Sequence, residues 1–93
     1  MSTVWLPQVL RPSAGGAKQL ELDGGSVKDL VGALVARHPS LRDQLLTPEG
    51  DLNRFVNVYV NGQDVRYLDG LETRVEAADE VRLLPAMAGG APR

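Results

Sequence analysis

The chain has 93 residues, a net charge of -2 at pH 7 and no cysteine. This length allows one small hydrophobic core, and the lack of cysteine excludes disulfides and thiolate metal sites. The balanced charge offers no basic surface for nucleic acid or an anionic membrane, and no apolar run approaches the roughly 20 residues that span a bilayer. The first residues lack a signal-peptide pattern, so we expect a soluble, cytoplasmic domain that binds neither nucleic acid nor membrane.

The N-terminal quarter has the pattern of a β-hairpin. Residues 3–6 and 17–22 alternate apolar and polar side chains as strands do, and Pro7 confines the first strand to an edge or an end. The Pro- and Gly-rich segment 11–16 between them is typical of a turn, so we expect the two strands to pair.

Ser26 begins the strongest helix pattern in the chain. Its hydroxyl suits an N-cap, Asp29 lies near the positive helix end, and Pro39 ends the pattern. Apolar residues recur every three or four positions between them, at Val27, Leu30, Val31, Leu34 and Val35. Such a stripe has to be covered by a sheet or another helix. Leucines within residues 41–46 predict a short second helix.

The C-terminal half predicts three further strands. Residues 55–60 form the clearest strand, and Asn61-Gly62 after it is a strong type I′ turn signal. We expect a short strand over residues 64–67, an irregular segment over residues 71–78 and a last strand over residues 80–84. The resulting order, β-β-α-β-β-β, indicates an α+β domain with a mixed sheet of about five strands and one main helix across one face.

Strand alternation separates the two faces of this sheet. Three valines of the third strand, at positions 56, 58 and 60, point at the helix because Asn57 marks the other face. The same reasoning leaves a set of large side chains on the outer face: Trp5, Phe55, Tyr59, Arg82 and Leu84. Aromatic residues beside arginine commonly anchor protein interfaces, so we predict a partner interface here that continues into Pro85 and Met87. The alternative is that these are ordinary, singly exposed apolar residues.

A Gly-Gly pair follows the last strand. Gly89 and Gly90 have no Cβ, so their backbone fits a narrow channel in another protein. The position of this pair directly after the last strand is more informative than the pair itself, because the chain also contains the pairs Gly15-Gly16 and Gly24-Gly25 in predicted turns.

This order of elements with a Gly-Gly tip resembles the ubiquitin-like (β-grasp) sulfur carriers of the ThiS/MoaD type. Residues 54–61, 64–66 and 79–90, together with the opening Leu6–Pro12, are especially similar to the CysO-like branch found in actinobacteria. The resemblance covers the whole chain to Gly90.

The resemblance implies a carrier rather than an enzyme. A ubiquitin-activating-type adenylating enzyme (MoeB/ThiF-like) would use MgATP to adenylate the C-terminal carboxylate of Gly90, and a sulfur donor would convert it into a thiocarboxylate. A sulfur-accepting synthase would then take the sulfur, while the carrier itself holds no cofactor and no metal. Cysteine, thiamin, molybdopterin and thio-sugar pathways all stay open, and the CysO-like motifs favour cysteine.

Three residues follow Gly90, whereas the resemblance requires Gly90 to carry the free C-terminal carboxylate. Their presence implies cleavage between Gly90 and Ala91, which the resemblance assigns to a JAMM-type zinc metalloprotease, and a general peptidase is the alternative. We therefore expect a β-grasp domain over residues 1–88 with a flexible tail from about residue 85. Residues 89–93 are the Gly-Gly tip with its removable Ala-Pro-Arg extension.

Two other functions compete with the sulfur carrier. A protein modifier would be joined through Gly90 to target lysines by the same activation, and a β-grasp binding module would carry an inert tail. Among the basic residues, Arg54, Arg66 and Arg82 either contact an acidic rim on the activating enzyme or are simply solvated.

Overall fold

A computed structural model of the chain describes residues 1–85. The expected sites at Met87, Gly89, Gly90 and Ala91 lie outside these described residues. The described part contains two α-helices, α1 (Val27–Arg37) and α2 (Arg42–Leu45). Its strands are β1 (Ser2–Trp5), β2 (Gln19–Leu22), β3 (Val56–Val60), β4 (Gln63–Asp64) and β5 (Glu80–Pro85).

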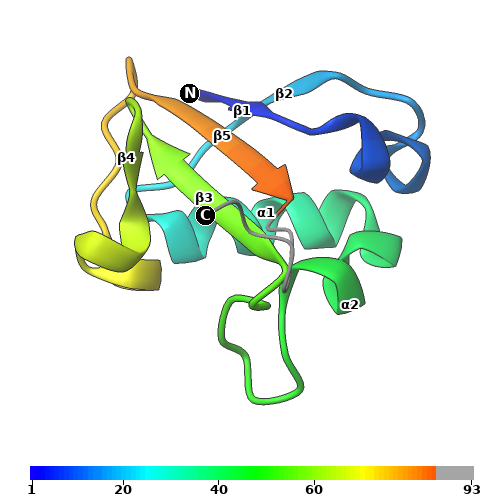
Figure 1. Cartoon of the computed structure of the whole chain (residues 1–93). Coiled ribbons are helices and arrows are strands. Elements are labelled where there is room, and N and C mark those ends of the chain that lie inside the picture. Colours follow the sequence, from blue (N-terminus) through cyan, green and yellow to red (C-terminus); the bar gives the residue numbers. More distant parts are fainter. Residues whose placement is uncertain (86–93) are drawn as a thin grey trace.

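The five strands form one mixed sheet, in the order β2-β1-β5-β3-β4. The central pair β1 and β5 is parallel, whereas the other neighbours are antiparallel. In Figure 1, α1 lies across one face of this sheet. The expected hairpin, the main helix and the short second helix are confirmed, and so is the α+β, β-grasp architecture.

The core confirms the predicted inner face of the sheet. Val56, Val58 and Val60 are buried against the stripe of α1, in which Leu34 is only 1% exposed. Val81 and Leu83 of β5 are buried with them, as are Val4 and Leu6. Burial of this apolar surface is the main favourable contribution to folding, and it fixes which side chains β5 presents outward.

Two segments differ from the sequence-based expectation. Residues 11–14 of the segment expected to be a turn belong to a 3-10 helix over Gln8–Ala14, which buries Leu10 and Ala14, whereas Gly15 and Gly16 form a turn as expected. The strand expected over residues 64–67 stops at Asp64, and a 3-10 helix, Val65–Tyr67, replaces its second half. Asp64 Oδ1 accepts a hydrogen bond from the Arg66 N–H at 2.8 Å, and Val65 is fully buried, so local capping and burial both favour the turn over an edge strand.

A capped turn places α1 against the sheet. Ser26 Oγ accepts the Asp29 N–H at 3.2 Å, and Asp29 Oδ2 in turn accepts the Gly25 N–H at 3.3 Å. A Cβ on Gly24 would lie 2.9 Å from Asp29 Cβ and 3.1 Å from the Leu30 nitrogen. The glycine at position 24 therefore permits close approach of the turn to the helix, which supports a capping role for this segment.

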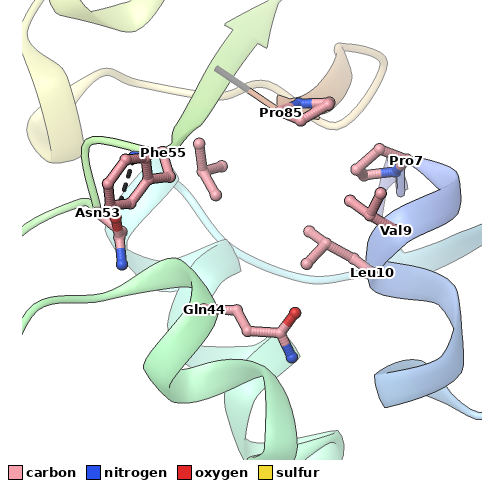
Figure 2. Close-up of a pocket in the computed structure, with 8 residues that line it drawn as sticks. Pro7, Val9, Leu10, Gln44, Asn53, Phe55 and Pro85 are labelled. Atoms are coloured by element: carbon pink, nitrogen blue, oxygen red, sulfur yellow. Dashed lines mark hydrogen bonds between the residues drawn. The ribbon is translucent and has the colours of Figure 1, made fainter. Parts of the chain in front are cut away.

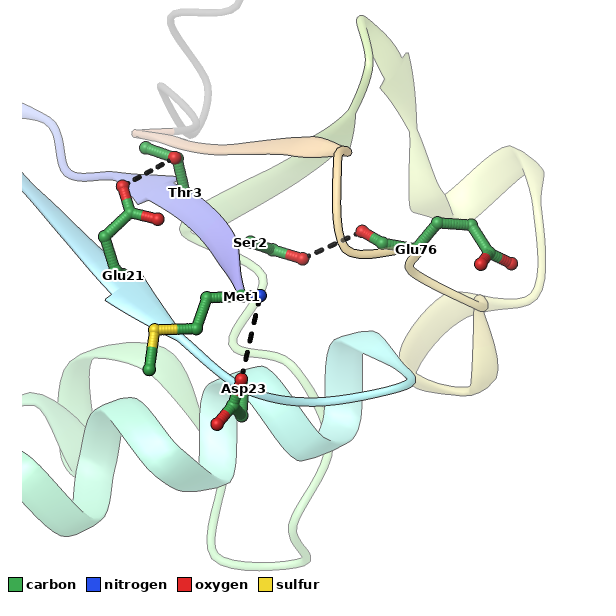
Figure 3. Close-up of polar contacts among 6 residues, drawn as sticks. All are labelled: Met1, Ser2, Thr3, Glu21, Asp23 and Glu76. Atoms are coloured by element: carbon green, nitrogen blue, oxygen red, sulfur yellow. Dashed lines mark hydrogen bonds and ion pairs between the residues drawn. The ribbon is translucent and has the colours of Figure 1, made fainter.

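Side-chain contacts hold β1 between its neighbours (Figure 3). The Ser2 hydroxyl is buried and donates to the Glu76 carbonyl at 2.9 Å, which ties β1 to the segment that leads into β5. Thr3 Oγ1 donates to Glu21 Oε2 at 2.7 Å across the β1–β2 pair. These contacts support the parallel pairing through which β5 is fixed at the centre of the sheet.

The expected tight turn after β3 is present, and Asp79 reinforces it. Asn61 and Gly62 have φ values of 51° and 87°, as a type I′ turn requires. Asn61 Nδ2 donates to Asp79 Oδ1 at 2.9 Å, and the Glu76 N–H donates to Asp79 Oδ2 at 2.8 Å. The Glu76 backbone hydrogen bond, helped by Asn61, lowers the pKa of Asp79. This carboxylate therefore has a structural role.

Replacing Asp79 by asparagine is expected to weaken the pH dependence of stability at acidic pH. Because the pKa is lower in the folded state, the ionised carboxylate stabilises the fold above its ordinary pKa, and that contribution is lost as the pH falls through the lowered value. Asp79 is half-buried at the surface, where water weakens its interactions. We therefore expect the melting temperature to fall less in the variant than in the parent between pH 6 and pH 2, with a difference of at most about 4 °C. Glu49→Gln, at an exposed loop position, is the control. Superimposable profiles for parent and Asp79→Asn would contradict the assignment.

Candidate functional site

The outer face of the sheet carries a row of three large side chains across its central strands. Arg82 of β5 is in register with Trp5 of β1 on one side and with Tyr59 of β3 on the other. The guanidinium carbon of Arg82 lies 5.1 Å from the centre of the Trp5 ring, within the range of a cation–π contact. We call Trp5, Arg82 and Tyr59 the outer row.

Glu80 fixes two members of the outer row. Its carboxylate accepts the indole N–H of Trp5 at 3.1 Å and lies 3.9 Å from the Arg82 guanidinium. The Arg82 and Glu80 side chains are each about half exposed, at 52% and 50%. The outer row is thus held in place by its own chain while its surface stays open to solvent, as an interface anchor requires.

Leu84 and Asn57 form the next pair on the same face. Leu84 is 40% exposed and is in register with Asn57. The Arg66 guanidinium donates to Asn57 Oδ1 and to the carbonyls of Asn53 and Val56, the latter two at 3.2 Å and 2.9 Å. Arg66 therefore braces the start of β3 while its side chain stays exposed, and its contact with a partner remains a prediction.

Phe55 and Pro85 lie at one end of the sheet and not in the outer row. β3 begins only at Val56, so Phe55 precedes the strand and is 53% exposed. Pro85 extends β5 by one residue beyond the expected strand and is in register with Val56, which faces the core. The outer-face position expected for Phe55 is therefore wrong, because its strand starts one residue later than the alternation suggested.

These two residues help to line an apolar pocket of about 280 Å³ (Figure 2). We call it the tail-base pocket. Its walls come from four separate parts of the chain: Pro7, Val9, Leu10, Gln44, Asn53, Phe55, Val56 and Pro85. Leu10 and Val56 are buried, whereas Val9 is 65% exposed. No sequence signal marked this pocket, because it forms only when the first 3-10 helix, α2 and the sheet come together.

The central strand β5 brings the chain to the edge of this pocket. It is paired with β1 from Glu80 to Arg82 and with β3 from Val81 to Pro85, so its direction is fixed as far as Pro85. Gly90 is five residues further along, and its Cα therefore lies at most about 17 Å from that of Pro85. Any protein that acts on Gly90 must therefore reach to within about 17 Å of Pro85, at the edge of the tail-base pocket.

Within residues 1–85, no three His, Asp or Glu side chains are grouped so that they could hold a metal ion. In the same part of the chain, no helix is both long and apolar enough to cross a membrane. The features with chemical interest are therefore the outer row, the tail-base pocket and the residues that follow β5.

Comparison with known proteins gives consistent results. The ThiS family model matches residues 4–90. The sulfur carrier protein CysO of Mycobacterium tuberculosis is 41% identical over 90 residues, which cover 95% of this chain and 97% of the relative. This relative is named as a carrier protein and not as an enzyme.

Solved structures agree with the sequence comparison. CysO in the crystal structure of the Amycolatopsis orientalis BexX/CysO complex matches with a TM-score of 0.88 and 41% identity, over 97% of this chain and 100% of that one. The small archaeal modifier protein 1 of Methanosarcina acetivorans matches with a TM-score of 0.80 and 31% identity, over 90% of each chain. The chain belongs to the ThiS family and is CysO-like.

Proposed function

We propose that this chain carries sulfur as a thiocarboxylate on Gly90, and that other enzymes load and unload it. The observation that carries the proposal is the place of the Gly-Gly pair, five residues beyond the last described residue of the central strand β5 in a CysO-like member of the ThiS family. A strand fixed on both sides gives the tail a defined starting point. Beside it lie the outer row and the tail-base pocket, which offer surface for docking.

The proposed loading has two steps. The Gly90 carboxylate attacks the α-phosphorus of MgATP held by a MoeB/ThiF-like adenylating enzyme, and pyrophosphate leaves. Hydrosulfide sulfur then attacks the acyl carbon of the adenylate, AMP leaves, and a thiocarboxylate remains. An α-carboxyl group has a pKa of about 3.3–3.7, so this chain supplies an ionised nucleophile at neutral pH without a general base. ATP and Mg²⁺ are bound by the enzyme and not by the carrier.

Residues after Gly90 have to be removed before loading, since adenylation requires a free Gly90 carboxylate. We assign the cut between Gly90 and Ala91 to a JAMM-type zinc metalloprotease. For unloading, the CysO relative from Amycolatopsis orientalis was solved in complex with BexX. By analogy we propose that this chain also binds a protein partner, a sulfur-accepting synthase, with cysteine or a thio-metabolite as the product.

Replacing Tyr59 by alanine is expected to weaken binding to the adenylating enzyme. Large aromatic anchors at the centre of an interface commonly contribute enough binding energy that their loss raises KM about tenfold or more. The measurement is ATP–pyrophosphate exchange with the chain ending at Gly90, and we expect kcat to stay within twofold because Tyr59 has no part in the proposed chemical steps.

Tyr67→Ala is the matched control for this experiment. Tyr67 is the other tyrosine of the chain, is 88% exposed and lies in the 3-10 helix after β4, away from the outer row. Its loss should leave KM unchanged. Equal KM values for the Tyr59 and Tyr67 variants would exclude the outer row as the docking surface.

A protein modifier is the second candidate, since the small archaeal modifier protein 1 shares this fold at 31% identity. Both functions use the same acyl-adenylate, which a lysine amine can attack as well as hydrosulfide. Adding the chain ending at Gly90 to cell extract with ATP distinguishes them. Mass spectrometry should find no lysine side chains joined to Gly90 if the chain is only a carrier, whereas such adducts would establish the modifier function.

A further inference from the structure

The tail-base pocket has the size and the apolar lining of a binding pocket for one apolar side chain. Its volume of about 280 Å³ is just below the roughly 300–1,000 Å³ of sites that enclose a small-molecule ligand. No charged side chain lines it. Val9 and Phe55 keep more than half of their surface exposed at its rim, where water contact is unfavourable.

The two polar residues of the pocket are already engaged with their own chain. Gln44 Nε2 donates to Ser13 Oγ at 2.7 Å. Asn53 Nδ2 donates to the Asp43 carbonyl at 3.4 Å, and Asn53 Oδ1 accepts the Phe55 N–H at 2.9 Å. Of the polar atoms in these two side chains, only Gln44 Oε1, an acceptor, takes part in none of these hydrogen bonds. The pocket therefore offers an anionic metabolite neither a charged partner nor a free side-chain donor, and an apolar occupant fits it better.

The position of the pocket identifies its partner. Pro85 is both a wall of the pocket and the last residue of β5, and Gly90 follows within about 17 Å. An enzyme that holds Gly90 in its active site therefore lies within about 17 Å of Pro85, near enough for the rim of that site to contact the pocket. In Figure 2, Pro7 and Val9 lie on the opposite side of the pocket from Phe55, and Pro85 lies between the two sides.

We propose that the tail-base pocket receives an aliphatic or aromatic side chain from the rim of the adenylating enzyme's active site. This inference rests on the proposed function and adds to it a second contact, separate from the outer row. The outer row would set the orientation of the carrier, while the pocket would hold the base of the tail at a fixed distance from the reacting carboxylate.

The test uses the chain ending at Gly90 and a ubiquitin-activating-type adenylating enzyme from the same organism, with ATP–pyrophosphate exchange as the readout. Val9→Asp places a charge at the rim of the pocket, so we expect KM to rise about tenfold or more. Val9→Ser, which removes the apolar rim without adding a charge, should raise KM several-fold. Leu68→Asp is the control, since Leu68 is also an exposed aliphatic residue, at 41%, but lies outside the pocket.

Val9 is 65% exposed, so both variants are expected to fold, and a melting temperature close to the parent's confirms it. Unchanged KM values for folded Val9→Asp and Val9→Ser would overturn the inference while leaving the proposed function intact. A parent chain that supports no exchange would instead contradict the proposed function, and this inference with it. Contacts between the Met87 methyl group and Leu10 or Val56 in NMR spectra of the free chain would also overturn it, because the chain's own tail would then fill the pocket.

Discussion

Ending the chain at Gly89 instead of Gly90 is expected to abolish adenylation. The shortened tail withdraws its carboxylate by one residue, about 3.5 Å, from the α-phosphorus of ATP. Because a misplacement of 1 Å can already cost about a hundredfold in rate, we expect kcat/KM to fall at least about a thousandfold. ATP–pyrophosphate exchange measures this loss, with the chain ending at Gly90 as the reference.

A chain ending at Ala91 is the companion variant, because it moves the carboxylate by the same distance in the opposite direction. It tests at the same time whether the residues after Gly90 block loading. Both lengths should be inactive if the tail reaches into a fixed active site. Activity within tenfold of the reference at either length would show that Gly90 is not the reacting residue.

Replacing Leu34 by alanine is expected to lower the stability of the fold more than the other substitutions proposed for this chain. Leu34 is 1% exposed and lies in the stripe of α1 that covers the inner face of the sheet. Removing a buried leucine side chain loses its transfer free energy and leaves a cavity, which together lower the free energy of unfolding by about 2–5 kcal/mol. This is a large part of the roughly 5–15 kcal/mol that stabilises a domain.

Urea denaturation with a fitted midpoint and slope measures this loss. Leu68→Ala, which removes the same atoms from a side chain 41% exposed, should cost less than about 1 kcal/mol. If the Leu34 and Leu68 variants had equal unfolding free energies, the packing of α1 on the sheet would have to be different from the one described.

The local patterns predicted most of the fold. Ser26 and Asp29 cap α1 as their spacing indicates, and the alternation in β3 correctly separated buried Val58 from outward-facing Tyr59. Such signals succeed because a cap or a strand face depends on residues close in the sequence. The pairing of Arg82 with Trp5 also follows from alternation once β1 and β5 are neighbours.

The differences depend mainly on contacts between segments distant in the sequence, with local capping at Asp64 as an added cause. The hydrogen bonds by which Arg66 braces Asn57 and the start of β3 were not foreseen, whereas its contact with a partner stays a prediction. Burial of Val65 shortened β4, and burial of Leu10 replaced a turn by a 3-10 helix. The tail-base pocket could not be predicted for the same reason, because four segments build it.

The central claim is that Gly90 carries sulfur, and an intact-mass measurement tests it most directly. The chain ending at Gly90 is incubated with the adenylating enzyme, MgATP and hydrosulfide, and its mass and fragments are recorded. We predict a gain equal to the difference between a sulfur and an oxygen atom, located on Gly90 and dependent on ATP. An adenylated chain that never gains this mass, or that gains it at another residue, would contradict the claim.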